Sequence, residues 1–138
     1  MLKKYCTDLG LLILRLGIGI MFVLHGTPKI TGGIELWTKL GSSMGNLGID
    51  FVPPFWGFMA ALSEFGGAIL LILGVGFRLA SFLMLTTMCV ATAHHFGKGD
   101  GIQGASHALE AGILFLSLFF TGPGKYTLRY KQKENAKK

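Results

Sequence analysis

The chain has 138 residues, of which 51% are hydrophobic and only 14% are charged. A soluble domain carries about 25% charged residues, so this composition disfavours a water-soluble protein and favours a single membrane domain. Most of the net charge of +6 lies in residues 125–138, a basic tail typical of a cytoplasmic anchor facing anionic lipid, and we expect no nucleic-acid partner.

Four apolar stretches predict four membrane-spanning helices, at about residues 9–24, 55–73, 79–93 and 105–120. Each stretch is somewhat shorter than the roughly 20 residues that cross a bilayer, a difference that apolar flanks and local lipid thinning make up. None of them alternates in polarity as a strand does. The expected fold is therefore all-α, a four-helix transmembrane bundle.

Proline and glycine mark the expected helix ends. Pro28 is predicted to stop the first helix and Pro53-Pro54 to open the second. Gly74-Val75-Gly76 predicts a tight turn before the third helix, and Gly122-Pro123-Gly124 ends the fourth.

The long connection between the first two helices contains a short amphipathic segment, Ile34 to Leu40. It predicts a short interfacial helix in this outer loop, anchored at the membrane surface by Trp37. The helix is either a lid over a pocket or a surface helix with no further role.

The basic residues predict the orientation. Lys3, Lys4, Arg78 and the tail all fall on one side of a four-pass chain. The side rich in Lys and Arg is cytoplasmic, so both termini are expected in the cytoplasm. The two cysteines, Cys6 and Cys89, should lie at different depths, which disfavours a disulfide between them.

Two ionisable residues fall inside the apolar stretches. Arg15 lies ten residues before His25, and Glu64 lies ten residues after Pro54, which puts both about 15 Å below the outer face. Equal depth and opposite charge predict a buried ion pair between Arg15 and Glu64. It would form either the polar floor of a ligand site or a structural pair that fixes helix packing.

All four histidines fall at the outer ends of predicted helices, and Glu110 lies one turn from His107 on the same helix face. We expect these side chains to converge beneath the outer surface. The predicted polar pocket comprises Arg15, His25, Lys29, Glu64, His94, His95, His107 and Glu110.

Three kinds of ligand are compatible with such a pocket. Imidazole and carboxylate groups suit a quinone headgroup, with histidine as proton donor, and two facing histidines suit haem. They also suit a metal ion, although no two histidines are spaced i, i+4. The metal candidates are His25, His94, His95, His107 and Glu110. The alternative is a set of interfacial histidines bonded to loop carbonyls.

The order of these features resembles the DoxX family of small four-helix membrane proteins. The resemblance covers about residues 14–126 and rests on Leu14-Arg15-Leu16-Gly17, His25-Gly26, Lys29, Glu64-Phe65-Gly66-Gly67, Leu73-Gly74, Phe77-Arg78, the histidines near His94 and Gly122-Pro123-Gly124. It implies a four-helix bundle in the bacterial inner membrane. The family is named for a subunit of an archaeal thiosulfate:quinone oxidoreductase, and some members resemble parts of membrane redox or oxidative-stress complexes.

These observations lead to one principal functional hypothesis and two alternatives. The principal hypothesis is a subunit or accessory of a membrane redox system, quinone-linked or protective against oxidative stress, with its pocket open to the outer side. The alternatives are a scaffold or assembly partner without chemistry of its own, and a small-solute carrier gated by Arg15 and Glu64. The sequence shows no self-sufficient catalytic motif, so an enzymatic activity stays open. The expected partners are the lipid bilayer and proteins of a membrane complex, and an oligomer is compatible with the sequence.

Overall fold

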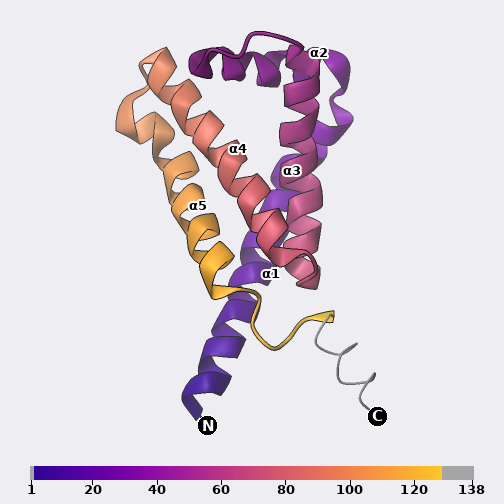
Figure 1. Cartoon of the computed structure of the whole chain (residues 1–138), viewed down its shortest axis with the longest axis vertical. Helices are drawn as coiled ribbons and strands as arrows, with labels where there is room; N and C mark the ends of the chain where they lie inside the picture. The colour runs from indigo at the N-terminus through magenta and orange to yellow at the C-terminus, as the bar shows by residue number, and fades with distance from the viewer. Residues whose placement is uncertain (1, 129–138) are drawn as a thin grey trace.

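The computed structural model describes residues 2–128, with side chains from Tyr5 onward. Four long helices run along the long axis of the molecule, and two short helical segments lie across one end (Figure 1). In chain order the elements are α1 (Leu2–Thr31), α2 (Gly33–Gly41), the 3-10 helix η1 (Ser42–Leu47), α3 (Pro53–Leu73), α4 (Phe77–Lys98) and α5 (Gly101–Thr121). The described chain contains no strand, which confirms the all-α prediction. Most of the predicted basic tail, residues 129–138, lies outside the described residues.

Four helices in the described chain are long and apolar enough to span a membrane. They cover Tyr5–Thr31, Pro53–Leu73, Phe77–Lys98 and Gly101–Thr121, and the last three have 21, 22 and 21 residues. Helices of this length match the roughly 30 Å hydrocarbon core of a bilayer. The chain is therefore a multi-pass membrane protein.

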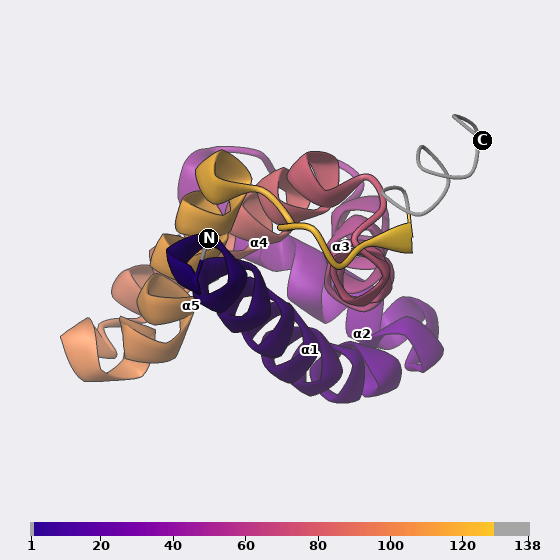
Figure 2. The same cartoon turned by 90° about the horizontal axis from the view of Figure 1, so that it is seen from below.

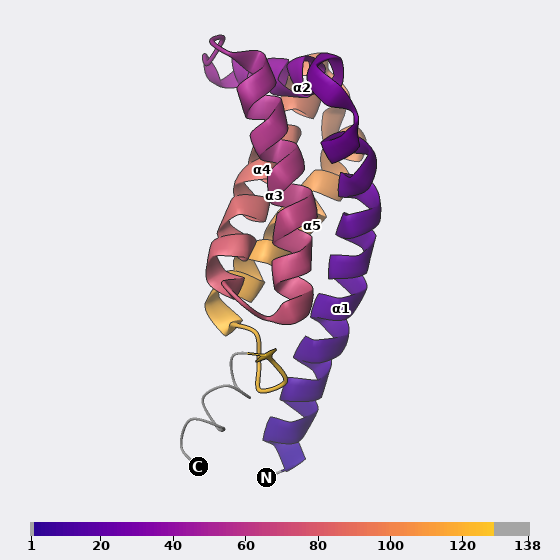
Figure 3. The same ribbon diagram turned by 90° about the vertical axis from the view of Figure 1, so that its right-hand side faces the viewer.

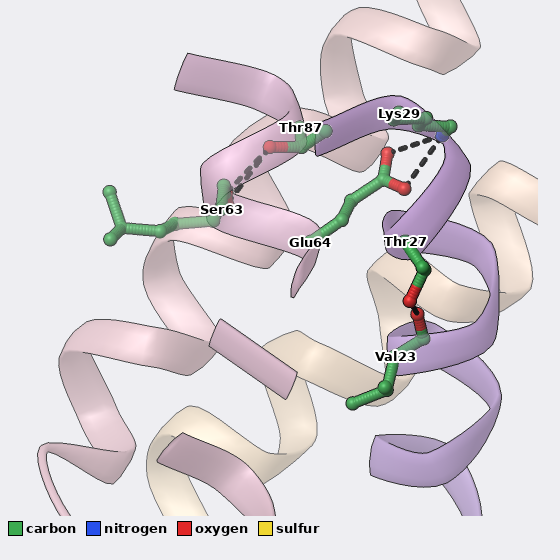
Figure 4. Close-up of polar contacts among 7 residues, drawn as sticks. Val23, Thr27, Lys29, Ser63, Glu64 and Thr87 are labelled. Atoms are coloured by element: carbon green, nitrogen blue, oxygen red, sulfur yellow. Dashed lines mark hydrogen bonds and ion pairs between the residues drawn. The ribbon is translucent and has the colours of Figure 1, made fainter. Parts of the chain in front are cut away.

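The prediction that Pro28 stops the first helix is wrong. Helix α1 continues through Pro28 to Thr31 and has 30 residues in all. Proline removes one backbone hydrogen bond but is tolerated in membrane helices, where nearby Ser and Thr hydroxyls bond the freed backbone groups. The carbonyl that Pro28 leaves without its usual donor is that of Leu24, four residues earlier. In the same turns the hydroxyl of Thr27 donates to the carbonyl of Val23 at 2.7 Å (Figure 4), and the Thr31 hydroxyl donates to the Thr27 carbonyl at 2.8 Å, so both threonine side chains are satisfied within the helix.

The bundle has two distinct ends. The α2 end carries α2, η1 and the α4–α5 turn, whereas the terminal end carries the start of α1, the Gly74–Gly76 turn and residues 122–128 (Figures 1 and 3). The first turns of α1 project beyond the other helices at the terminal end (Figure 3). Tyr5 and Tyr126 stack edge to face there, with ring centroids 6.3 Å apart. Both described ends of the chain therefore lie at the same end of the bundle.

Helix α2 confirms the predicted short helix, and Trp37 holds it against the spanning helices. Its indole packs edge to face on Phe58 of α3, with ring centroids 4.9 Å apart, and its Nε1 donates to the Lys29 carbonyl at 2.9 Å. The backbone of α2 lies so close to α3 that a Cβ at Gly57 would collide with the Trp37 carbonyl. Trp37 therefore fixes α2 to α1 and α3, because its ring and its N–H both find partners within the protein.

Small residues let α1 approach α3 closely. A Cβ at Gly26 would lie 2.8 Å from the backbone nitrogen of Phe65, and a Cβ at Gly19 would lie 3.2 Å from the carbonyl oxygen of Ala68. Small residues at helix contacts are the usual basis of packing in membranes, where lipid gives helices no hydrophobic reason to associate. These contacts also fix the register of α1 against α3. Gly26 lies level with Phe65, and Phe65 directly follows Glu64 in α3.

The four spanning helices form two hairpins. Helix α1 packs along α3 and α5 packs along α4, while α3 and α4 join the two pairs. Seen from below, α1 and α5 diverge toward the α2 end (Figure 2). Between them, Phe22 and Phe115 make an edge-to-face contact with ring centroids 5.0 Å apart, and both side chains belong to the buried core. Large aromatic side chains thus close the face between α1 and α5.

Candidate functional site

The strongest electrostatic contact in the described chain joins Lys29 of α1 to Glu64 of α3. The Lys29 ammonium donates to both carboxylate oxygens, at 2.6 Å to Oε2 and 2.8 Å to Oε1 (Figure 4). Glu64 is only 4% exposed, whereas the Lys29 side chain is 33% exposed. The extension of α1 beyond Pro28 creates this pair, because it carries Lys29 past the level of Glu64 so that the side chain can reach back.

The ion pair makes a buried carboxylate tolerable inside a membrane bundle. An unpaired charge in a low-dielectric interior costs several kcal/mol, and a charge-assisted hydrogen bond to each oxygen offsets much of that cost. One residue earlier on α3, Ser63 accepts a hydrogen bond from the Thr87 hydroxyl of α4 at 3.1 Å (Figure 4). Adjacent polar positions of α3 therefore bond to helices on both sides.

A second polar contact joins α1 to α5. The rings of His25 and His107 have centroids 5.8 Å apart and are tilted by 49°. Both histidines are exposed, and His25 also makes an edge-to-face contact with Phe22 at 6.2 Å. His25 and Lys29 are four residues apart on α1 and hence one turn apart on the same face. The imidazole pair thus stands above the Phe22–Phe115 contact and next to the ion pair.

The other two histidines lie apart from this pair, at the end of α4. Nδ1 of His95 lies 2.8 Å from Oδ2 of Asp100, and Nδ1 of His94 lies 3.5 Å from the Asn46 side-chain amide. Asn46 belongs to η1, and a Cβ at Gly97 would collide with its side chain. These contacts attach η1 and the α4–α5 turn to α4, which is a structural role that the sequence did not separate from the pocket.

The predicted convergence of all the histidines and acids in one pocket does not occur. Glu110 is exposed on α5. Among the residues that the structure describes, no three His, Cys, Asp or Glu side chains form a group able to hold a metal ion. Zinc sites use three or four protein ligands, so His25 and His107 fit a hydrogen-bonding pair better than a metal centre. Cys6 and Cys89 are both free and exposed.

The predicted ion pair between Arg15 and Glu64 is wrong. Arg15 lies toward the terminal end, where its Nη1 and the side chain of Thr127 both approach Gly74. Glu64 stands level with Gly26, eleven residues further along α1, which is roughly 16 Å at 1.5 Å per residue. The prediction took His25 as the outer end of the first helix, so it placed Arg15 too near the α2 end.

The course of segment 122–128, here called the strap, was also not predicted from the sequence. It leaves α5 at Gly122 and crosses the terminal end toward the α3–α4 turn (Figures 1 and 2). The Lys125 backbone N–H donates to Oδ1 of Asp8 at 3.0 Å, and Thr127 is buried against Gly74. Nothing in the local sequence of 122–128 identifies Asp8 and Gly74 as its neighbours, because these contacts connect distant parts of the chain.

The comparisons with known proteins agree with this architecture. The DoxX family model matches residues 10–96. An uncharacterized protein of Haemophilus influenzae is 33% identical over 136 residues, which cover 94% of this chain and 95% of that protein. The inner membrane protein YqjF of Escherichia coli is 31% identical over 130 residues, covering 91% of this chain and 93% of that protein. No solved structure matches. Four apolar spans, a family match over most of the chain and two relatives that match almost end to end lead to one conclusion: the chain belongs to the DoxX family.

Proposed function

We propose that the protein is an accessory subunit of a membrane redox system and that it binds the headgroup of a quinone-class molecule at His25 and His107. The observation that supports this most directly is the imidazole pair itself, exposed between α1 and α5 with ring centroids 5.8 Å apart. Both residues lie within spanning helices, so a ligand dissolved in the bilayer reaches them without entering water.

The functional groups of a quinone headgroup match those of the side chains around His25 and His107. A quinone headgroup is a flat ring with two carbonyl acceptors, and each neutral imidazole offers one N–H donor. Phe22 and Phe115 supply an aromatic wall below the histidines, and aromatic rings favour stacked or edge-on contact with another ring. Histidine is the side chain that most often serves as a general acid in proteins, so either imidazole is able to deliver a proton to a reduced quinone oxygen.

Quinone reduction requires two electrons and two protons. In this proposal the electrons come from a redox-active partner protein, and this chain holds the headgroup and supplies protons. The Lys29–Glu64 pair has a positioning role, because it fixes the end of α1 on α3 one turn from His25.

The proposal also includes an orientation. The α2 end faces outward from the bacterial inner membrane and the terminal end faces the cytoplasm, since Arg78 and Lys125 are exposed at the terminal end and basic residues are retained on the cytoplasmic side. The quinone site is then near the outer leaflet. The name of the Escherichia coli relative supports the inner membrane as the location.

The test compares His25→Phe and His107→Phe with a matched control, His95→Phe. Phenylalanine keeps a ring of similar size but removes both nitrogens. Protein is purified in mild detergent, extracted with organic solvent, and the quinone content per protein is measured by mass spectrometry. We expect at least a tenfold loss in each of the first two variants and none in the control, since a hydrogen bond lost in an apolar site accounts for a factor of that order.

Wild-type protein that carries no quinone, and that binds none when a short-chain quinone is added, would contradict the proposal. The scaffold hypothesis predicts that result together with partner proteins that still co-purify with both histidine variants. A haem bound between His25 and His107 is the second candidate, because it also needs two facing imidazoles. An absorption spectrum of the same preparation distinguishes it by an intense band near 400 nm that both variants lose.

A further inference from the structure

The strongest unexplained feature outside the proposed quinone site is the side chain of Arg15. It is only 3% exposed, yet its Nε and Nη1 are buried without a hydrogen-bond partner among the described residues. The ion pairs of the described chain are Lys29–Glu64 and His95–Asp100, both at the α2 end, so neither provides an acid for Arg15. A guanidinium is always charged in proteins, and burying it without a counter-charge is strongly unfavourable.

The groups around Arg15 indicate what kind of ligand could accept hydrogen bonds from its guanidinium. Its Nη1 lies against Gly74, in the turn that follows α3, and the side chain of Thr127 in the strap lies against the same glycine. Asp8 is the acid nearest to it along α1, but it lies two turns away and already accepts the Lys125 N–H. A water molecule would satisfy a donor without supplying negative charge. Among the described residues no acid pairs with Arg15, so the group that would balance its charge is an anion.

The depth of the guanidinium points to the kind of anion. The turn from Gly74 to Gly76 joins the ends of two spanning helices, Pro53–Leu73 and Phe77–Lys98. A side chain level with this turn lies at the edge of the hydrocarbon core, where lipid phosphates begin. The planar guanidinium matches the oxygens of a phosphate through paired N–H donors. Arg78 is exposed at the same end, so it can attract anions only in a general way and serves as a comparison for the buried Arg15.

From these observations we propose that Arg15, at the α3–α4 turn and beneath the strap, forms a binding site for a phosphate-bearing anion, with the headgroup of an anionic lipid as its source. This site is at the opposite end of the bundle from the proposed quinone site and goes beyond that proposal. The strap covers the bound phosphate, and Arg15 supplies the charge that selects an anionic lipid over a neutral one.

The test uses the full-length protein, stripped of lipid in detergent and titrated with phosphatidylglycerol or phosphatidylcholine, with bound lipid counted by native mass spectrometry. Arg15→Gln removes the charge and keeps much of the side-chain length. Arg78→Gln is the matched control, because it removes an exposed arginine from the same end. We expect phosphatidylglycerol binding to weaken at least tenfold in Arg15→Gln and by less than twofold in Arg78→Gln, and phosphatidylcholine binding to be equal in all three proteins.

Equal weakening in both variants would overturn the proposal, since it would show a general attraction of anionic lipid to basic residues. Unchanged binding in Arg15→Gln would overturn it as well. If Arg15→Gln does not fold, the wild-type protein still decides: in nanodiscs its melting temperature must be several degrees higher in phosphatidylglycerol than in phosphatidylcholine, and equal values would contradict the site. Inorganic phosphate added to the phosphatidylcholine nanodiscs distinguishes the sources. A rise in melting temperature as large as that from phosphatidylglycerol would assign the site to a soluble anion and exclude the lipid as source.

Discussion

The two partners of the Lys29–Glu64 ion pair differ in how far they are exposed. Glu64 is buried and cannot reach water, whereas the Lys29 side chain is one third exposed and is long enough to extend toward the α2 end. Loss of the lysine leaves a buried carboxylate without its partner cation. Loss of the carboxylate leaves a lysine that can partly rehydrate.

Glu64→Gln should therefore destabilise the protein by roughly 1–3 kcal/mol, the cost of leaving a charged donor poorly paired. Thermal unfolding in detergent measures this loss. The double variant Lys29→Met, Glu64→Gln should recover part of it, since removing both partners leaves no unpaired charge. Glu110→Gln is the matched control, because Glu110 is exposed, and it should change stability by less than about 0.5 kcal/mol. A loss in the control as large as that in Glu64→Gln would contradict the assigned role of the pair.

At this scale the sequence identified the unusual residues but not their partners. Arg15 and Glu64 were recognised because ionisable groups in apolar stretches are costly, and both are indeed buried. Lys29 was included in the pocket, yet its contact with Glu64 was not foreseen. The pairing depends on the register of α1 against α3, and that register is set by the close approach of Gly26 to Phe65, which no single-residue property reveals.

At the scale of the helix, two glycines of α1 differ in what surrounds them. Gly26→Ala should destabilise the protein by about 1–3 kcal/mol, because its methyl group would press on the backbone of Phe65 and force α1 away from α3. Gly17→Ala is the matched control. A Cβ there meets nothing within 4 Å, so the change should stabilise the helix by up to about 1 kcal/mol. Melting temperatures in one detergent that moved in the same direction would refute the proposed packing of α1 on α3.

The start of α3 contains a strained residue. Val52 precedes Pro53 with φ of 47°, in the left-handed region that a β-branched residue rarely adopts. Its side chain is 59% exposed, so little packing compensates for the strain. Val52→Gly should raise stability by about 1 kcal/mol, measured by thermal unfolding. Val75→Gly is the control in another turn. Because φ of Val75 is not positive, that change should destabilise by up to about 1 kcal/mol.

The helix boundaries were the least accurate of the predictions made from the sequence. The helices were placed correctly in order and number, but each is longer than predicted, and α1 extends at both ends. Pro28 was predicted to end the first helix because, in water, the backbone groups exposed by a helix break are hydrated at little cost. In lipid the cost of unpaired backbone groups keeps the helix continuous past Pro28 to Thr31.

For the whole molecule, the proposed orientation has a direct test in the native cysteines. Cys6 and Cys89 are both exposed on the protein surface, but Cys6 lies in the first turns of α1, which project beyond the other helices (Figure 3), whereas Cys89 lies midway along α4. A membrane-impermeant maleimide should label Cys6 in inside-out vesicles and not in intact spheroplasts. Cys89 should stay unlabelled in both, because lipid covers it. Ser42→Cys in η1 should show the reverse of Cys6, and labelling of Cys6 from outside the cell would invert the orientation.

The global architecture followed from composition because the bilayer leaves few options. Long apolar segments must form helices to satisfy their backbone, and four of them make a bundle. The division into two hairpins, the aromatic contact of Phe22 with Phe115 and the course of the strap did not follow. These depend on which helix faces pair, and lipid-facing and protein-facing residues are similarly apolar in a membrane.

The link between Lys29 and Glu64 has a consequence for biogenesis. The two residues are 35 positions apart, which at about 5–20 residues per second of translation separates their emergence by roughly 2–7 seconds. During that interval the nascent first span carries a cation whose carboxylate has not yet been made. The first two spans therefore gain from leaving the insertion machinery together, as a preassembled hairpin. The strap, synthesised after all four spans, contacts the amino-terminal span that the ribosome released first.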